Sequence, residues 1–131
     1  MKRRTLILLL VLVAIGAVAR EVRVEDLAAA SVNGEMIGFS QLLAETKGEN
    51  ESLRETLKGQ ELVDAIVKLR KAHLEIIIDR VLLQQELKHR DFAPSPHTTD
   101  EQIDQIIRDH FHSDRRQWLK RLRPNASIRI F

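Results

Sequence analysis

A long amphipathic segment between about Gln60 and Arg90 constrains the fold more than any other feature of this sequence. With 3.6 residues per turn, its apolar side chains fall on neighbouring rows of one helix face, and most of its charged side chains fall on the opposite face. A stripe this wide has to be covered by other elements, so we expect a mainly α fold built around one central helix. The rows are Leu62, Leu69, Ile76 and Leu83, then Ile66, His73, Arg80 and Leu87, widened by Val63, Val67, Leu74, Ile77 and Val81.

Two apolar residues of this segment, Ile78 and Leu82, fall on its polar face, one turn apart. Phe92, Phe111 and Trp118 are further large apolar residues near the ends of predicted elements. If these five side chains stay exposed, they form an apolar patch suited to binding extended peptide segments. In the alternative, the last helix folds over them and buries them. An exposed patch could also serve to form a homodimer.

A small β element is predicted from the two ends of the segment that follows residue 19. Asn33-Gly34 is a strong signal for a tight hairpin, here between 28–32 and 35–37. Residues 128–131 have strand character, and a strand in that position needs an edge to pair with. We therefore expect one small antiparallel sheet that joins the hairpin to the last strand, beside the helical body.

Shorter helices are expected before the long one. Ser40 is a natural N-cap for a helix that ends near Gly48. A second short helix is predicted over 49–58, and Gly59 is expected to break it.

Two more helices are expected after the long one. Pro94 and Pro96 mark the end of the long helix. The sequence Thr-Thr-Asp-Glu over 98–101 is a capping box that starts the next helix. Ser113 or Asp114 then caps a last short helix that contains Trp118 and stops at Pro124 and Asn125.

The first nineteen residues resemble an export signal. A basic start, Lys2-Arg3-Arg4, precedes fourteen residues without a polar side chain, 6–19, which end in Ala17-Val18-Ala19. As a helix this run would reach about 21 Å, short of a hydrocarbon core of about 30 Å. We therefore predict a secretory signal peptide over 1–19, cleaved after Ala19, a single domain over 20–131, and a periplasmic or secreted protein that touches the membrane only transiently through its signal. The alternative is an uncleaved inner-membrane anchor.

Composition removes several classes of function. The chain has no cysteine, which excludes disulfides, thiol chemistry and cysteine–zinc sites. Residues 20–131 carry 18 basic and 19 acidic side chains, so the basic excess lies in the signal and general nucleic-acid binding is not expected. No glycine-rich phosphate loop is present, which argues against an ATP-driven mechanism. No cofactor is expected.

The histidines do not predict a reactive site. His110 and His112 have Asp109 and Asp114 nearby, but side chains two positions apart on a helix point in different directions, so surface histidines are favoured over a metal site. His73 lies inside the apolar stripe without a nucleophile or acid at a catalytic spacing, so we expect a packed, hydrogen-bonded histidine.

Arg80, in the same stripe, is expected to pair with a carboxylate. A basic stretch near the end of the chain is interpreted as a solvated helix face rather than as a site for anionic lipid. It comprises Arg115, Arg116, Lys120, Arg121, Arg123 and Arg129.

Four segments in this order resemble the SurA-type N-terminal chaperone domain. Residues 32–42 (VNGEMIGFSQL) are similar to its opening strand, turn, second strand and capped helix. Residues 77–87 (IIDRVLLQQEL) are similar to its long helix, and 98–104 (TTDEQID) to the capped helix that follows. Residues 116–119 and 128–130 resemble its closing helix and strand. The resemblance covers about 28–131.

The sequence departs from this family pattern at three places. Met36 stands where the family often has proline, and Asp91 where it often has glycine. The family also commonly inserts a parvulin-type peptidyl-prolyl isomerase domain before the closing helix, and there is no room for one between Phe111 and Asp114.

The resemblance implies a non-enzymatic, ATP-independent holdase for unfolded exported or outer-membrane proteins. The alternatives are an assembly subunit with one dedicated partner and a residual prolyl isomerase.

Overall fold

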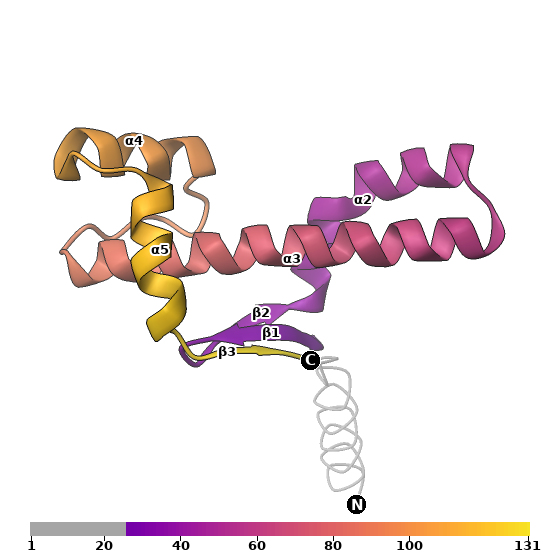
Figure 1. The fold of residues 1–131 in the computed structure, drawn as a ribbon, viewed down its shortest axis with the longest axis horizontal. Helices are drawn as coiled ribbons and strands as arrows, with labels where there is room; N and C mark the ends of the chain where they lie inside the picture. Colours follow the sequence, from indigo (N-terminus) through magenta and orange to yellow (C-terminus); the bar gives the residue numbers. More distant parts are fainter. Residues whose placement is uncertain (1–25) are drawn as a thin grey trace, which may run out of the picture.

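The computed structural model describes residues 26–131 (Figure 1). The predicted signal peptide, its cleavage site and residues 20–25 lie outside the described residues. The fold is mainly helical, with one long helix and a small antiparallel sheet, as predicted. In chain order the elements are β1 (Ala28–Val32), β2 (Glu35–Gly38), α2 (Phe39–Thr56), α3 (Gly59–His89), α4 (Asp100–Phe111), α5 (Arg115–Asn125) and β3 (Ile128–Ile130).

The sheet joins the first and last described elements. Its strand order is β2-β1-β3, and both pairings are antiparallel. The turn between β1 and β2 consists of Asn33 and Gly34, both with positive φ (51° and 85°), which is the backbone of a type I′ hairpin. β3 pairs with the opposite edge of β1, with Ala30 opposite Ile130. The predicted meeting of the hairpin and the last strand in one sheet is therefore confirmed.

The 31-residue helix α3 is the spine of the molecule, and its neighbours lie on two sides of it (Figure 1). The sheet packs on one side of its middle, α2 and α4 lie on the other side at opposite ends, and α5 crosses near its C-terminal end. α3 ends at His89, and Asp91 just after it has a φ of 62°. Glycine adopts this left-handed conformation most easily, which explains why the family often has glycine at the position of Asp91.

α2 differs from the expectation of two short helices. It is one continuous helix of 18 residues that passes through Gly48. The helix-forming residues that follow Gly48, together with Leu53 against α3, outweigh the cost of one glycine. Ser40 does not cap it, because the helix already begins at Phe39; the Asp26 carboxylate instead accepts hydrogen bonds from the Ser40 backbone N–H (3.2 Å) and hydroxyl.

The caps of α4 and α5 lie close to where the sequence placed them. The capping box of α4 is shifted by one residue, with Thr99 and Gln102 exchanging hydrogen bonds between side chain and backbone. Asp114 caps α5 by accepting from the Gln117 backbone N–H at 2.8 Å. α5 includes Pro124 and ends one residue later.

The core consists of two adjoining clusters along α3. The first lies between the sheet, the start of α2 and the middle of α3, and the second lies between the C-terminal end of α3, α4 and α5. Leu119 and Leu122 of α5 pack against both clusters. Within residues 26–131, none of the helices combines the length and apolar character needed to span a bilayer. The core clusters hold Ala30, Val32, Ile37, Leu42, Ile77, Ile78 and Leu82, and Leu83, Leu87, Ile103, Ile107 and Trp118.

Candidate functional site

Three of the five residues predicted to form an exposed peptide-binding patch are in the core. Ile78, Leu82 and Trp118 are only 0%, 2% and 4% exposed. The expectation of exposure was wrong for Ile78 and Leu82 because the sheet packs against that side of α3, so the middle of the helix is buried on more than one face. Trp118 is covered because α5 folds across the end of α3 and α4.

Phe92 and Phe111 are half-buried in an aromatic cluster at the α4–α5 end of the molecule. The Phe111 ring lies 5.3 Å from the Phe92 ring and 5.2 Å from the Trp118 ring, measured between centroids. The Arg90 guanidinium covers both Phe111 and Trp118, at 5.1 and 4.8 Å from their ring centroids. The five predicted residues therefore do not form one open surface.

A different apolar surface is exposed, on the helical arm formed by residues 47–73. The arm is the C-terminal half of α2 packed against the N-terminal half of α3, and Figure 1 shows it extending beyond the sheet. No residue from 47 to 73 is fully buried, whereas Thr46 and Leu74 at its root are. Two helices that contact only each other can cover only one stripe on each. The arm therefore keeps an apolar surface that a third element would normally cover.

The apolar side chains of the arm differ in how much of each is exposed. Val63 and Val67, one turn apart on α3, are 52% and 46% exposed. The apolar side chains between the two helices are half-buried: Leu53 and Leu57 from α2 and its C-cap, and Leu62, Ile66 and Leu69 from α3. The surrounding charges nearly cancel, with six basic and five acidic side chains between residues 47 and 73. This arrangement can bind an apolar segment but offers little net charge to select one.

Polar groups at the root of the arm are incompletely paired. His73 Nε2 lies 3.0 Å from the Glu49 carboxylate and links α3 to α2, so His73 is hydrogen-bonded as expected. The Arg70 guanidinium stacks over the Phe39 ring at 5.6 Å. Among the described residues, Arg70 Nε and Asn50 Oδ1 are buried without a hydrogen-bond partner. The root is thus less well satisfied than the core that begins at Leu74.

An ionic cluster joins α2, α3, α4 and α5 at the centre of the molecule. Arg80 donates to both oxygens of Asp100, at 3.1 and 3.0 Å, and to Glu45 at 2.7 Å. Arg115 donates to Asp100 at 3.2 Å and to Asp104 at 2.8 Å. The expectation that Arg80 pairs with a carboxylate is confirmed. Through Arg80, the cluster links α2 and α4, which lie at opposite ends of α3, to the middle of α3.

The protonation states of this cluster are fixed by its hydrogen bonds. Burial acts to raise the pKa of Asp100, but hydrogen bonds from Arg80 and Arg115 outweigh it and hold that pKa below its ordinary value. The hydrogen bond to Asp100 raises the pKa of Arg80. Burial likewise acts to raise the pKa of Glu86, and hydrogen bonds from Arg121 and Arg90 bring it below its usual range. These groups are charged at neutral pH and hold helices together, which is a structural role.

Half of the predicted basic face is used in such pairs. Arg115 is paired as above, Arg121 with Glu86 at 3.1 Å, and Arg123 with Asp79 at 2.7 Å. Arg116, Lys120 and Arg129 make no ion pair with the described residues. The interpretation as a simple solvated face is therefore correct for only part of the stretch.

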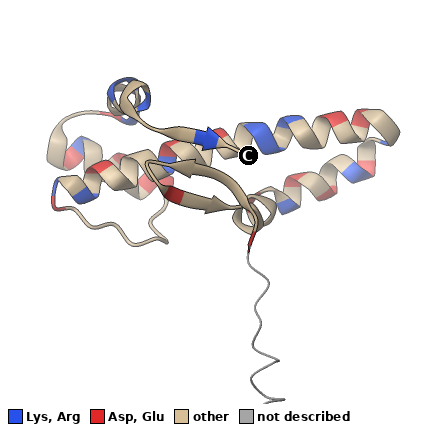
Figure 2. Cartoon of the chain, turned by 90° about the horizontal axis from the view of Figure 1, so that it is seen from below, with Lys and Arg blue, Asp and Glu red and all other residues tan. Residues whose placement is uncertain are grey.

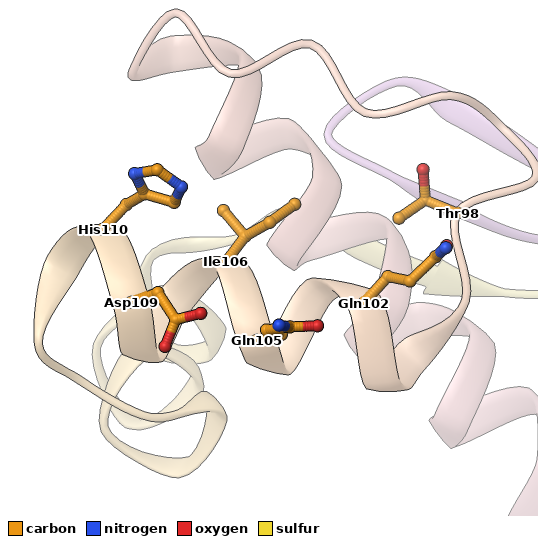
Figure 3. A pocket seen from close by; sticks show the side chains of 6 residues that line it. All are labelled: Thr98, Gln102, Gln105, Ile106, Asp109 and His110. Atoms are coloured by element: carbon orange, nitrogen blue, oxygen red, sulfur yellow. The ribbon is translucent and has the colours of Figure 1, made fainter.

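A shallow groove of about 390 Å³ runs along the outer face of α4. Figure 3 shows its lining from Thr98 past Ile106 to His110, with polar side chains on both sides. His110 lies 4.8 Å from the Phe92 ring, and His112 occupies the left-handed C-cap of α4. Residues 26–131 contain no group of three or more His, Cys, Asp or Glu side chains placed to hold a metal ion.

Comparison with known protein families shows which family this chain belongs to. The family described as a SurA-like N-terminal domain matches residues 4–125. The chain belongs to this family. The SurA-like N-terminal domain is a chaperone-type module, and the hairpin, long helix and closing strand that carried the resemblance are present in the structure. Searches of curated proteins and of solved structures found no match.

Two further features bear on function within this SurA-like chain. α4 and α5 are joined by only residues 112–114, so no isomerase domain is inserted at that point. Exposure of the helical arm was not predicted from the sequence, although the length of the apolar stripe could have indicated it. The apolar stripe of the long segment is 31 residues long, but the sheet, α4 and α5 form core clusters only with the part of α3 from Leu74 onward, which leaves α2 against its first half.

Proposed function

We propose that this protein is an ATP-independent, non-enzymatic chaperone that holds apolar segments of unfolded exported proteins, including outer-membrane proteins, on its helical arm. The observation that carries the proposal is the run from 47 to 73 without a buried residue, with Val63 and Val67 about half exposed. Membership in a chaperone-type family supports it. The signal-like sequence over 1–19 supports export to the periplasm or beyond.

The size of the arm favours transient clients over one stable partner or a homodimer. The α3 part of the arm, residues 59–73, is roughly 22 Å long, and two packed helices present a face roughly 18 Å wide. This gives about 400 Å² per partner, against about 800 Å² for a stable interface. A surface of this size favours rapid exchange, which a holdase needs if its client is to leave and fold.

The balanced charge of the arm indicates how clients are selected. Six basic and five acidic side chains leave almost no net potential over residues 47–73. Binding energy then comes from apolar area, at about 25 cal/mol per Å² removed from water. We therefore expect affinity to change little with salt and to depend on the length of the client's apolar segment.

The test is suppression of aggregation of a urea-unfolded outer-membrane protein on dilution, without ATP. The variant Val63→Ser/Val67→Ser removes the exposed apolar side chains while keeping comparable helix propensity. Losing about half the burial energy of two valines should weaken client binding roughly fivefold to tenfold. A proline-peptide isomerisation assay in parallel should give the uncatalysed rate.

Met36→Ser is the matched control, because Met36 is also exposed, at 59%, but lies on the sheet. It should suppress aggregation as well as the unchanged protein does. The proposal fails if the protein does not suppress aggregation at several-fold molar excess. The assignment to the arm fails if the double valine variant and the control behave alike.

A further inference from the structure

The sheet has an uncovered outer face that the proposed chaperone surface does not use. Ala30, Val32 and Ile37 point into the core, with exposures of 0%, 0% and 1%. Side chains alternate along a strand, so the row formed by Met36, Ser31 and Arg129 lies on the opposite face. Figure 2 views the molecule from this side and shows the strands in front of the helices.

Exposed apolar side chains are concentrated at this sheet. Eight large apolar residues of the described chain are exposed, and four of them lie in the sheet or next to it. They are Leu27 (74%), Phe131 (71%), Met36 (59%) and Ile130 (58%). Phe131 follows Arg129 by two positions and so shares its face, and its N–H bonds the Ala29 carbonyl at 3.1 Å. Leu27 immediately precedes β1, at the same end of the sheet as Phe131.

The rest of the chain joins at this same end. Residues 1–25 connect to Asp26, which the hydrogen bonds to Ser40 fix next to the sheet. The fourteen-residue apolar run, 6–19, is separated from Asp26 by only six residues. The seven residue steps from 19 to 26 span at most about 25 Å. Whenever the apolar run is inserted in a bilayer, the sheet end is therefore held within that distance of the lipid surface.

One basic side chain of this face is free to contact the phosphate groups of a lipid surface. Arg129 lies in its central row and forms no ion pair with any residue from 26 to 131. We propose that, while the chain retains residues 1–19, the outer sheet face lies against the surface of a phospholipid bilayer, with Leu27, Met36 and Phe131 in contact with lipid. α2 and α4, on the other side of α3 from the sheet, then face away from the lipid.

The test uses the full chain, whose lack of cysteine permits single-site labelling. Met36→Cys and Gln105→Cys are each labelled with an environment-sensitive dye and mixed with vesicles of phosphatidylglycerol and phosphatidylethanolamine that carry a lipid-bound quencher. Gln105 is exposed on α4, on the other side of α3 from the sheet. We expect quenching of the label at Met36 and not of the label at Gln105. Adding Arg129→Glu should weaken the surface contact by at least about fivefold, the effect expected for one arginine near an anionic surface.

Three results would overturn the proposal. Equal quenching at both sites would mean that the molecule has no preferred orientation. No quenching at Met36 would mean that the face stays away from lipid. A change at Met36 without vesicles that grows with protein concentration would show that a second copy of the chain covers this face. Because Arg129 lies in β3 and is not part of the arm, Arg129→Glu should suppress client aggregation normally, which separates this proposal from the chaperone function.

Discussion

Replacing Arg80 by methionine should loosen the attachment of α4 and α2 to the centre of α3. Arg80 is the only described residue that bonds both Asp100, at the start of α4, and Glu45, on α2. Methionine keeps the length and helix propensity of the side chain but removes all three hydrogen bonds. Asp100 then retains only Arg115, at 3.2 Å.

The expected magnitude follows from the partial burial of the pair. The side chains of Arg80 and Asp100 are 20% and 26% exposed. Exposed pairs are worth about 0.2–1 kcal/mol, and removal of one partner from a fully buried pair costs about 3–5 kcal/mol. For this intermediate pair with bidentate geometry, we expect Arg80→Met to lower the free energy of unfolding by about 2 kcal/mol. The coupling energy with Asp100→Asn should be about 1 kcal/mol.

Trp118 provides the assay, because it is the single tryptophan and is only 4% exposed in the native state. Urea unfolding is followed by its fluorescence for the unchanged protein, the two single variants and the double variant. With an m-value of about 2 kcal/mol per M, Arg80→Met should lower the midpoint by about 1 M. The two single effects should not add in the double variant.

Arg108→Met is the control for a pair that contributes little. Arg108 and Asp109 lie 3.9 Å apart and are 69% and 55% exposed, so its loss should change stability by less than about 0.3 kcal/mol. A coupling energy between Arg80 and Asp100 below about 0.3 kcal/mol would show that the central ionic cluster does not hold the helices together.

Three other changes test the fold in the same unfolding assay. Gly48 lies inside α2 with open space where an added methyl group would lie, so Gly48→Ala should stabilise the protein by about 0.5–1 kcal/mol. Gly34 has a φ of 85°, so Gly34→Ala should destabilise it by about 1 kcal/mol. Effects of the same sign for the two variants would contradict the assigned backbone. Thr99→Ala should cost about 1 kcal/mol and Thr98→Ala much less, and the reverse order would move the cap of α4 back to Thr98. The pKa values of Asp100 and Glu86 are lowered in the folded state, so their contribution to stability is complete above the unfolded values of about 4. It is lost as the pH falls from there through the lower folded-state values, and stability that is flat from pH 6 to pH 2 would refute it.

Local signals predicted the elements of this fold well. Asn33-Gly34 specified the hairpin because two consecutive left-handed residues suit few other structures. The 3.6-residue apolar period predicted α3. Residues 128–130 have strand character and a strand pairs with another strand, which predicted the sheet with the hairpin. Three predicted helix boundaries were wrong. Ser40 does not cap α2 but donates to Asp26, and α2 continues through Gly48. The N-cap of α4 is Thr99 instead of the neighbouring Thr98, which has the same side chain.

The candidate surface could not be predicted in the same way, because exposure depends on which face the neighbours choose. Ile78 and Leu82 looked exposed on a single-helix projection, but the sheet packs on that face. Val63 and Val67 belonged to the predicted buried stripe, yet the elements that would cover them lie further along α3. Periodicity identifies a helix's apolar side but not how much of its length is covered.

The strand order of the sheet has a consequence for how the chain reaches its native state. β1 is the central strand, yet one of its two neighbours, β3, lies about a hundred positions later in the chain. During synthesis one edge of β1 stays unpaired until residues 128–130 have been made. Closing such a distant pair is slow compared with forming helices and hairpins. We therefore expect the β1–β3 pairing to form late in folding, and a chain that lacks β3 leaves an exposed strand edge that can pair with other chains.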